Sequence, residues 1–327
     1  MALIEVEDLA RTFTVRRKAG RLRRTTDLVH AVRDLSFAVD RGEMVGYIGP
    51  NGAGKSTTVK MLTGILVPTS GHLRVAGLEP SRARTELARR IGVVFGQRTT
   101  LWWDLPLRDS FGLLQKIYRV PDDRFRRNLD EFLELLDLGP LLDTPVRQLS
   151  LGQRMRGDIA AALLHDPEIL YLDEPTIGLD VISKGRLREF LRTLNAERGT
   201  TLLLTTHDLQ DIEALCRRVI IIDHGKIFFD GPLAEIVGRF STHKIVALTF
   251  GEAPQCDFSK AGEVLERDDR RVKLRILRAQ VTDTLRDLLA TCRVHDVSVE
   301  DPPIEEVIRQ VFAAEANSRI EAEAAAK

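Results

Sequence analysis

The chain has 327 residues, more than one hydrophobic core usually organises, and this length predicts two domains of unequal size. Lysine plus arginine and aspartate plus glutamate each number 48, so the formal net charge is zero. No overall field therefore draws the chain to nucleic acid or to an anionic membrane, and we expect no nucleic-acid partner.

The three cysteines, Cys216, Cys256 and Cys292, lie far apart and form no Cys-x-x-Cys pair. This spacing indicates neither a disulfide framework nor a zinc site, and it is typical of a protein in a reducing compartment. No run approaches the roughly 18 to 20 apolar residues that are needed to cross a bilayer. We therefore expect a chain that is neither secreted nor membrane-spanning by itself.

The first elements of the chain are apolar or alternating runs that predict strands, at residues 3–9, 35–39 and 44–49. A basic run, RRKAGRLRR at 16–24, interrupts them. This run is either the solvated tip of a hairpin or a contact for anionic lipid or for an acidic loop of a partner. The beginning of the chain is therefore predicted to be rich in sheet.

GPNGAGKST, at 49–57, follows the predicted strand MVGYI and precedes a helical pattern, which is the context of a P-loop. Glycines let backbone N–H groups close on phosphate oxygens, and the following helix N-terminus adds a favourable dipole. Lys55 is predicted to reach the β and γ phosphates, and Ser56 to place its hydroxyl on Mg²⁺. The nucleotide-binding residues predicted in this loop are Gly49, Pro50, Asn51, Gly52, Ala53, Gly54, Lys55, Ser56 and Thr57.

From about Ala83 to His165 the pattern becomes helical and charged, with apolar residues at three- and four-residue spacing in 124–138. This pattern predicts a helical insertion, at about 98–165. Within it, LSLGQ places Ser150 and Gln153 at capping-box spacing. A helix is therefore predicted to begin there, with its N-terminus open to a phosphate.

Strands return at 168–175, 200–207 and 218–231 with helical segments between them, which is typical of a parallel α/β sheet. Asp173 and Glu174 come at the carboxyl end of the first of these strands, where such sheets bind ligands. Asp173 is predicted to contact Mg²⁺ through water, and Glu174 to orient or deprotonate an attacking water.

After about residue 239 the pattern changes to three short strands, a helix near 280–292, a further strand and a last helix from Pro303. This predicts a small α+β domain at 240–314, after a nucleotide-binding domain at 1–239. Residues 315–327 are rich in alanine and glutamate, and they are predicted to be a frayed helix or a disordered end.

GPNGAGKST, the glutamine of VVFGQ, LSLGQ, LYLDEP, GLD and TTHD occur in the order found in ABC transporter ATPases. The chain resembles this family over about residues 3–240. The resemblance implies an α/β fold with a P-loop NTPase core, an N-terminal antiparallel β subdomain and an inserted helical subdomain, plus the small C-terminal α+β domain. It also implies ATP and Mg²⁺ as cofactors and ATP hydrolysis as the reaction.

The resemblance implies further roles by position. Gln97 is predicted to touch Mg²⁺ and to couple to a membrane subunit, and His207 to contact the γ-phosphate during catalysis. Asp180 matches the nucleotide-proximal D-loop. Phe13 is the candidate for the aromatic ring that stacks on adenine, with a place in the core as the alternative.

LSLGQ resembles the family signature LSGGQ, with Leu151 in place of the first glycine. In that family the signature binds the ATP held by another copy, which here assigns Ser150, Gly152 and Gln153 to the nucleotide. ATP is therefore predicted to join a head-to-tail dimer, either of identical chains or with a related ATPase subunit.

GQRTTLWWDLP and LSLGQRMR are similar to the ATPase subunits of type-2 ABC exporters, the group of daunorubicin-type drug exporters and sodium exporters. This similarity implies membrane-spanning permease subunits as partners and a peripheral place at the cytoplasmic face of the membrane. Trp102 and Trp103 are either anchors for the permease or core residues. The competing functions are a soluble non-transport ABC ATPase and a nucleotide-dependent regulator.

Overall fold

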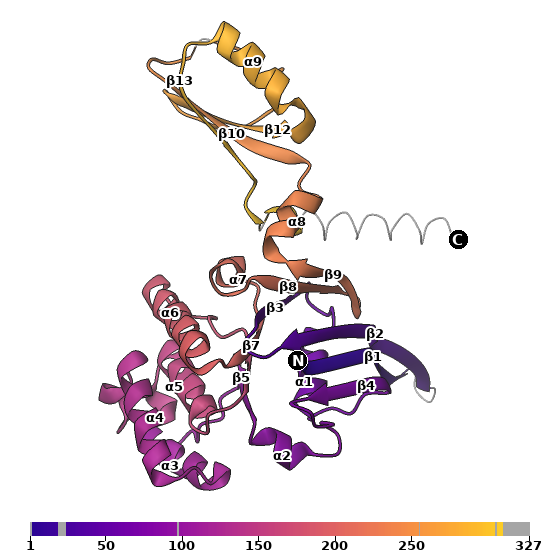
Figure 1. Ribbon diagram of the computed structural model, residues 1–327, viewed down its shortest axis with the longest axis vertical. Coiled ribbons are helices and arrows are strands. Elements are labelled where there is room, and N and C mark those ends of the chain that lie inside the picture. The colour runs from indigo at the N-terminus through magenta and orange to yellow at the C-terminus, as the bar shows by residue number, and fades with distance from the viewer. Residues whose placement is uncertain (1, 19–23, 97, 255, 305, 310–327) are drawn as a thin grey trace. The chain divides into compact units, whose positions relative to one another are not determined.

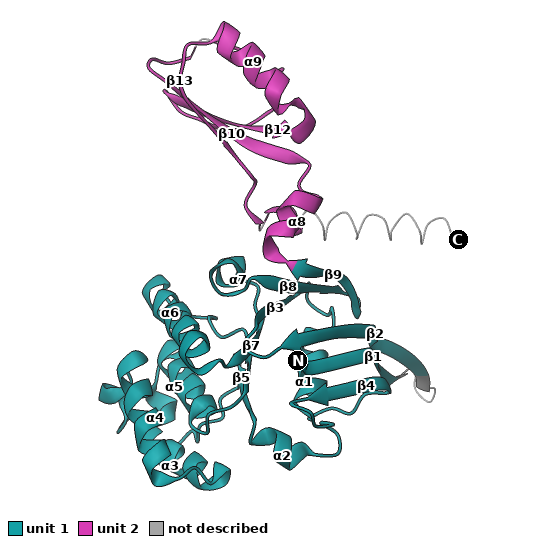
Figure 2. Cartoon of the chain, viewed as in Figure 1, with its two compact units in different colours: residues 1–231 teal, residues 232–327 magenta. Residues whose placement is uncertain are grey.

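The computed structural model describes residues 2–18, 24–96, 98–254, 256–304 and 306–309. The chain divides into two compact units, residues 1–231 and 232–327 (Figure 2). The first unit ends before the predicted boundary at residue 239, because helix α8 (Leu233–Phe240) groups with the second unit. The predicted tail at 315–327 lies outside the described residues.

The first unit begins with an antiparallel sheet in the order β2-β1-β4 (Figure 1). The runs predicted as strands at 3–9 and 35–39 lie inside a much longer hairpin, because each strand continues by pairing with the other. Residues 19–23, which connect these two strands in the sequence, lie outside the described residues, so the alternatives for the basic run at 16–24 both stay predictions. The strands are β1 (Ala2–Lys18), β2 (Arg24–Asp40) and β4 (Ser70–Val75).

A second sheet of the first unit has the order β5-β6-β7-β3-β8-β9, and its first five strands pair in parallel. Strands buried on both faces of a parallel sheet are apolar along their length, as ILYLD and TLLLT are here. The strands are β3 (Met44–Ile48), β5 (Ile91–Phe95), β6 (Ile169–Asp173), β7 (Thr201–Thr205), β8 (Arg218–Asp223) and β9 (Lys226–Pro232).

Two parts of this sheet differ from the sequence prediction. The range predicted as helical from residue 83 contains strand β5, since IGVVF is a short buried run that pairs with β6. The strand predicted at 218–231 is two strands, because the chain turns at His224 (φ 46°) and Gly225 (φ 78°). Two successive residues with positive φ are typical of a tight hairpin turn.

The predicted helical insertion is confirmed, and in chain order it lies between β5 and β6. Phe132 of this insertion is fully buried and meets Phe190 edge to face, with the ring centroids 5.9 Å apart. The insertion contains α3 (Leu107–Tyr118), α4 (Asp122–Leu135), 3-10 turns at Gly139–Leu141 and Val146–Gln148, and α5 (Leu151–Leu163). The other helices of the unit are α1 (Lys55–Leu62), α2 (Arg84–Ala88), α6 (Val181–Arg198) and α7 (Leu209–Leu215).

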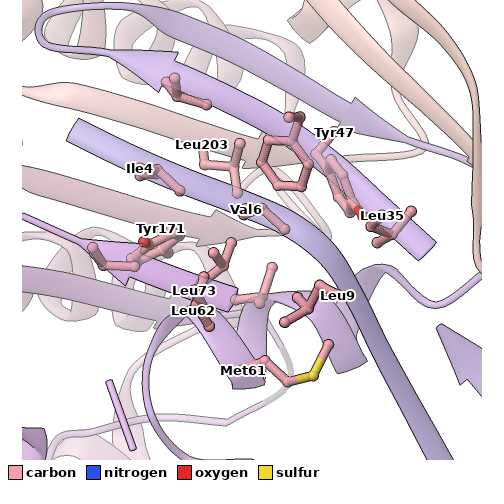
Figure 3. Close-up of a cluster of buried hydrophobic side chains, with 14 of the residues drawn as sticks. Ile4, Val6, Leu9, Leu35, Tyr47, Met61, Leu62, Leu73, Tyr171 and Leu203 are labelled. Carbon is pink, nitrogen blue, oxygen red and sulfur yellow. The ribbon is translucent and has the colours of Figure 1, made fainter. Parts of the chain in front are cut away.

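A core of buried side chains joins the two sheets through α1 (Figure 3). Tyr47 of β3 is fully buried there, and its hydroxyl lies 3.1 Å from the hydroxyl of Thr58 on α1. This core therefore fixes the strand before the P-loop and the helix after it. The side chains labelled in Figure 3 are Ile4, Val6, Leu9, Leu35, Tyr47, Met61, Leu62, Leu73, Tyr171 and Leu203.

The second unit contains a sheet in the order β11-β12-β10-β13, with buried side chains of β10 and β12 packed in one cluster with those of α9. The predicted α+β character of this region is confirmed. Its elements after α8 are β10 (His243–Phe250), β11 (Glu263–Arg267), β12 (Arg271–Leu277), a 3-10 turn (Arg278–Gln280), α9 (Val281–Thr291) and β13 (Val294–Glu300).

One expectation about this unit is wrong: Cys256 and Cys292 form a disulfide. The two residues are 36 positions apart, so nothing in their spacing indicates a pair. The fold brings the loop after β10 onto the end of α9, and the two sulfur atoms meet there. Cys216 is a free and buried cysteine.

None of the helices in the described part of the chain combines the length and the apolar character of a membrane span.

Candidate functional site

A cavity of about 510 Å³ opens at the carboxyl ends of the parallel strands. Four of these strands lead to residues that line it, because β3, β5, β6 and β7 end on the same edge of the sheet. The cavity therefore collects groups that lie far apart in the sequence. It is lined by Ala31, Asn51, Gly52, Gly54, Lys55, Ser56, Thr57, Lys60, Ile65, Phe95, Gly96, Arg98, Asp173, Glu174 and His207.

The P-loop wraps closely around the start of α1. Gly54 caps this helix in the left-handed region, with φ 108°, and a Cβ there would come within 2.5 Å of the Ala31 carbonyl oxygen. Only glycine fits such a position. The first residues of α1, Lys55, Ser56 and Thr57, line the cavity, as an anion site at a helix N-terminus requires.

Lys55 is buried, and its ammonium group is hydrogen-bonded to the backbone of the P-loop. Its Nζ donates to the carbonyl oxygens of Gly49, at 2.5 Å, and Pro50, at 3.1 Å. Burial lowers the pKa of Lys55, and the carboxylates of Glu174 and Asp173 oppose that change. The ammonium therefore lies among carbonyl acceptors that phosphate oxygens could replace.

Asp173 lies between the P-loop and strand β7. Its Oδ2 accepts a hydrogen bond from the Ser56 hydroxyl at 3.5 Å, and its Oδ1 accepts one from Thr205. The described residues contain no group of three or more His, Cys, Asp and Glu side chains that would hold a metal without help. A hydroxyl next to one carboxylate fits a hard cation that takes its remaining oxygen ligands from phosphates and water.

Glu174 and His207 lie next to each other in the wall of the same cavity. Glu174 has a positive φ of 57°, a strained conformation for a residue with a side chain. The backbone N–H of His207 donates to Glu174 Oε2 at 3.3 Å, and His207 Nε2 lies 3.4 Å from Oε1. Burial raises the pKa of Glu174, although the neighbouring His207 acts in the opposite direction. A carboxylate shifted in this way is suited to accept a proton from water.

The predicted helix start at LSLGQ is confirmed as a capping box. The Ser150 hydroxyl accepts from the backbone N–H of Gln153 at 3.2 Å, and Gln153 Oε1 accepts from the backbone N–H of Ser150 at 2.9 Å. Leu151 packs beside Gly178, where a Cβ would come within 2.3 Å of Leu151 Cδ2. Neither Ser150 nor Gly152 nor Gln153 lines the cavity of its own chain.

The remaining predicted residues lie elsewhere. Asp180 caps α6 by accepting hydrogen bonds from the backbone N–H and the hydroxyl of Ser183, at 2.9 and 2.7 Å. Phe13 lies on β1 opposite Val29, with the Arg11 guanidinium 4.7 Å from the centre of its ring. Neither Asp180 nor Phe13 lines the cavity. Gln97 lies outside the described residues.

Several cavity residues are not predicted from the sequence. Arg98 follows Gln97 directly, so its place next to that motif is a signal that sequence reasoning could have used. Ala31, Lys60 and Ile65 carry no such signal, because the packing of β2 and α1 brings them to the cavity.

Comparison with known proteins gives consistent results along the chain. A family described as ABC transporter matches residues 32–177, and one described as EvrA-like ABC transporter, C-terminal domain, matches 242–300. The ABC transporter ATP-binding protein NatA of Bacillus subtilis (strain 168) is 32% identical over 234 residues, which cover 72% of this chain and 91% of the relative. The daunorubicin resistance ATP-binding protein DrrA3 of Streptomyces coeruleorubidus is 34% identical over 285 residues, covering 85% and 89%.

A solved structure supports the same relation. It is a dimeric post-hydrolysis state of an ATP-binding cassette bound to ADP and Pi. It matches with a TM-score of 0.61 and 26% identity, and the match covers 70% of this chain and 98% of that one.

Proposed function

The chain belongs to the family of ABC transporter ATP-binding proteins, and on this premise we propose that two copies close on ATP and drive export through separate membrane-spanning subunits. The chain is an ATPase related to the ATP-binding subunits of exporters. The dimer, the roles of individual residues, Mg²⁺, the permease and the direction of transport belong to the proposal.

The observation that carries the proposal is that the proposed phosphate-binding features of one chain lie at two separate places. Lys55, Ser56 and Glu174 line one cavity, whereas the helix N-terminus capped by Ser150 does not line it. A second copy in head-to-tail orientation supplies Ser150, Gly152 and Gln153 to the nucleotide held by the first. ATP then joins the two chains, and ADP does not, because ADP lacks the γ-phosphate that both chains contact.

Exposed apolar side chains next to Asp180 support a second copy at this place. Val181 is 86% exposed and Ile182 is 72% exposed at the start of α6, and Ile177 is also exposed. Large apolar side chains gathered in this way are typical of interaction surfaces rather than of free surface.

The cavity residues take distinct roles in this proposal. Lys55 and the backbone of the P-loop hold the β and γ phosphates, and His207 contacts the γ-phosphate. Glu174 accepts a proton from, or orients, the attacking water. Ser56, Asp173 and Gln97 would hold Mg²⁺, which neutralises charge on the phosphoryl oxygens when it is bound. Phe13 stays the candidate for stacking on adenine.

The transport partners are proposed from the relatives. DrrA3 is named for daunorubicin resistance and NatA for an ABC transporter, and the resemblance to type-2 exporters implies separate membrane-spanning chains as partners. Export is therefore the proposed direction, and the cytoplasmic face of the membrane is the proposed location. The partner copy is either identical or a related ATPase subunit.

Replacing Glu174 by Gln tests the central step. We expect Glu174→Gln to bind MgATP, to lose turnover by roughly 100- to 10,000-fold, and to run as a dimer in sizing chromatography only when MgATP is present. The matched control is Glu189→Gln, an exposed glutamate of α6 paired with Arg192, which should hydrolyse ATP at the wild-type rate. Turnover by Glu174→Gln close to that of the wild type contradicts the assigned role of Glu174.

A further inference from the structure

A buried carboxylate on α5 lies outside the nucleotide cavity. Asp158 is 5% exposed. Its Oδ1 accepts three hydrogen bonds: from the Thr99 hydroxyl at 2.9 Å, the Thr100 backbone N–H at 2.8 Å and the Thr100 hydroxyl at 3.0 Å. Burial raises the pKa of Asp158, and these hydrogen bonds oppose that change. Burying a carboxylate is costly unless such donors compensate, so the three bonds fix residues 99–100 on the helix.

Residues of α5 that precede Asp158 also contact the segment that contains Thr99 and Thr100. Arg154 lies three residues before Gly157 and four before Asp158, so its side chain is a neighbour of both on the surface of α5. A Cβ at Gly157 would come within 3.0 Å of Leu107 Cδ1 and 3.1 Å of Leu101 Cδ1, which shows that both leucines pack against the helix backbone.

Arg154 completes this contact surface. Its guanidinium lies 5.4 Å from the centre of the Trp103 ring, a distance at which a cation and an aromatic face attract each other. The segment 99–107 therefore follows one face of α5 from Asp158 to Arg154, and it is attached by hydrogen bonds, apolar packing and a cation–π contact.

The two ends of this contact surface lie next to residues that have roles in the proposed function. The segment starts directly after Arg98, which lines the nucleotide cavity. The helix starts at the Ser150 cap, about 12 Å along the axis from Asp158 at 1.5 Å per residue. Because a helix with intact hydrogen bonds bends little, a displacement of residues 99–107 is carried to its N-terminus.

We propose that Asp158 is a positioning residue that joins the segment leaving the nucleotide cavity to the signature helix, so that the two move as one body. This inference rests on the proposed function, in which Ser150 at the start of that helix contacts ATP held by a second copy. Asp158 itself touches neither nucleotide nor water in the reaction, and it acts through Thr99, Thr100 and α5.

The inference predicts a specific kinetic pattern. Asp158→Ala removes the acceptor and leaves three partly buried donors without this partner, so residues 99–100 detach from α5. We expect kcat to fall by 10-fold or more, because the signature acts only in the closed dimer. The Kd of MgATP for the single chain should stay within twofold of the wild type, because Lys55 and the P-loop hold that nucleotide without the signature.

Two further variants separate hydrogen bonding from charge and from stability. Asp158→Asn keeps an acceptor oxygen and should restore kcat to within about threefold of the wild type. Thr99→Val with Thr100→Val removes the two hydroxyl donors at nearly constant volume, and should reproduce most of the loss seen with Asp158→Ala. Adding Asp158→Ala to this pair should cost little more, since the same contact is already lost.

The matched control is Asn128→Ala. Asn128 is also buried in the helical insertion, where its Nδ2 donates to the Leu164 carbonyl oxygen at 3.1 Å, away from residues 99–107. It should lower the unfolding temperature and leave kcat within twofold at a temperature well below unfolding. If Asp158→Ala fails to fold, the Thr99→Val, Thr100→Val chain carries the same test.

The results overturn the inference if both the Asp158→Ala and the paired threonine variants keep kcat within twofold of Asn128→Ala, or if they lose MgATP affinity in proportion to kcat/KM. A failure of the proposed function gives a different result: Glu174→Gln then forms no dimer with MgATP. If only this inference is wrong, Glu174→Gln dimerises with MgATP to the same extent with and without Asp158→Ala.

Discussion

Leu151 occupies the third position of LSLGQ, where the signature motif has glycine. Its side chain is 36% exposed and packs beside Gly178, so it leaves the helix N-terminus open. The Ser150 hydroxyl and the backbone N–H groups of the first turn are unaffected by the size of this side chain. The replacement is therefore compatible with the phosphate-binding role that we propose for this helix end.

Gly152 is in a different position. A Cβ there would come within 2.8 Å of Leu179 Cδ2, and the residue lies in the first turn of α5. In the proposed dimer its backbone approaches the γ-phosphate, where an added carboxylate meets like charge in a partly desolvated site.

These two positions give opposite predictions. We expect Leu151→Gly to change ATP turnover by less than about tenfold, roughly 1.4 kcal/mol, whereas Gly152→Asp abolishes cooperative hydrolysis and leaves nucleotide binding by the single chain intact. Turnover against ATP concentration and equilibrium nucleotide binding measure both effects. The reverse ranking contradicts the assignment, and an increase of several orders of magnitude for Leu151→Gly shows a naturally weakened site.

At the scale of elements, the segment before α3 carries two exposed aromatic rings. Trp102 is 37% exposed and Trp103 is 49% exposed, so neither ring belongs to the core of the first unit. Such exposure argues against the core alternative, and the interface anchor stays a prediction for this pair. Exposed tryptophans next to one another are typical of the centre of protein interfaces.

Replacing both tryptophans by alanine is predicted to weaken attachment to the membrane subunit at least tenfold, about 1.4 kcal/mol, with little change in ATP affinity. Co-purification with the permease and equilibrium nucleotide binding measure the two effects. Leu289→Ala, an exposed apolar side chain of α9 in the second unit, is the control and should co-purify normally. Normal co-purification of the doubly substituted chain rejects this docking surface.

At the scale of the whole molecule, the disulfide closes a loop of the second unit between Cys256 and Cys292, which are 36 residues apart. Closing a loop of that length in the unfolded chain corresponds to about 4 kcal/mol of stabilisation in the chain-entropy model. The bridge is thus able to contribute a large part of the stability of a unit with a small core.

Thiol titration of the denatured chain tests this bridge. We expect one free thiol, from Cys216, without reductant and three after reduction, while Cys216→Ala should show none before reduction. The double change Cys256→Ser and Cys292→Ser should lower the urea midpoint of the second unit relative to the unreduced wild type. Three free thiols in the unreduced protein contradict the bridge.

The sequence by itself determined the features that depend on near neighbours in the chain. The P-loop, the capping box at Ser150 and the strand before Asp173 each lie within about ten residues, so local geometry and hydrophobic pattern predict them. The order of these motifs predicts the family, and the comparisons confirm it.

Only the tertiary structure decided which distant residues meet. Strand β5 resembles part of the helical stretch around it until it pairs with β6, and Cys256 has no local reason to meet Cys292. Asp158 looks like an ordinary charged helix residue in the sequence, yet the fold buries it against Thr99 and Thr100, 58 and more positions away. Contacts of this kind depend on how separate elements pack, and packing is a property of the whole core rather than of any one segment.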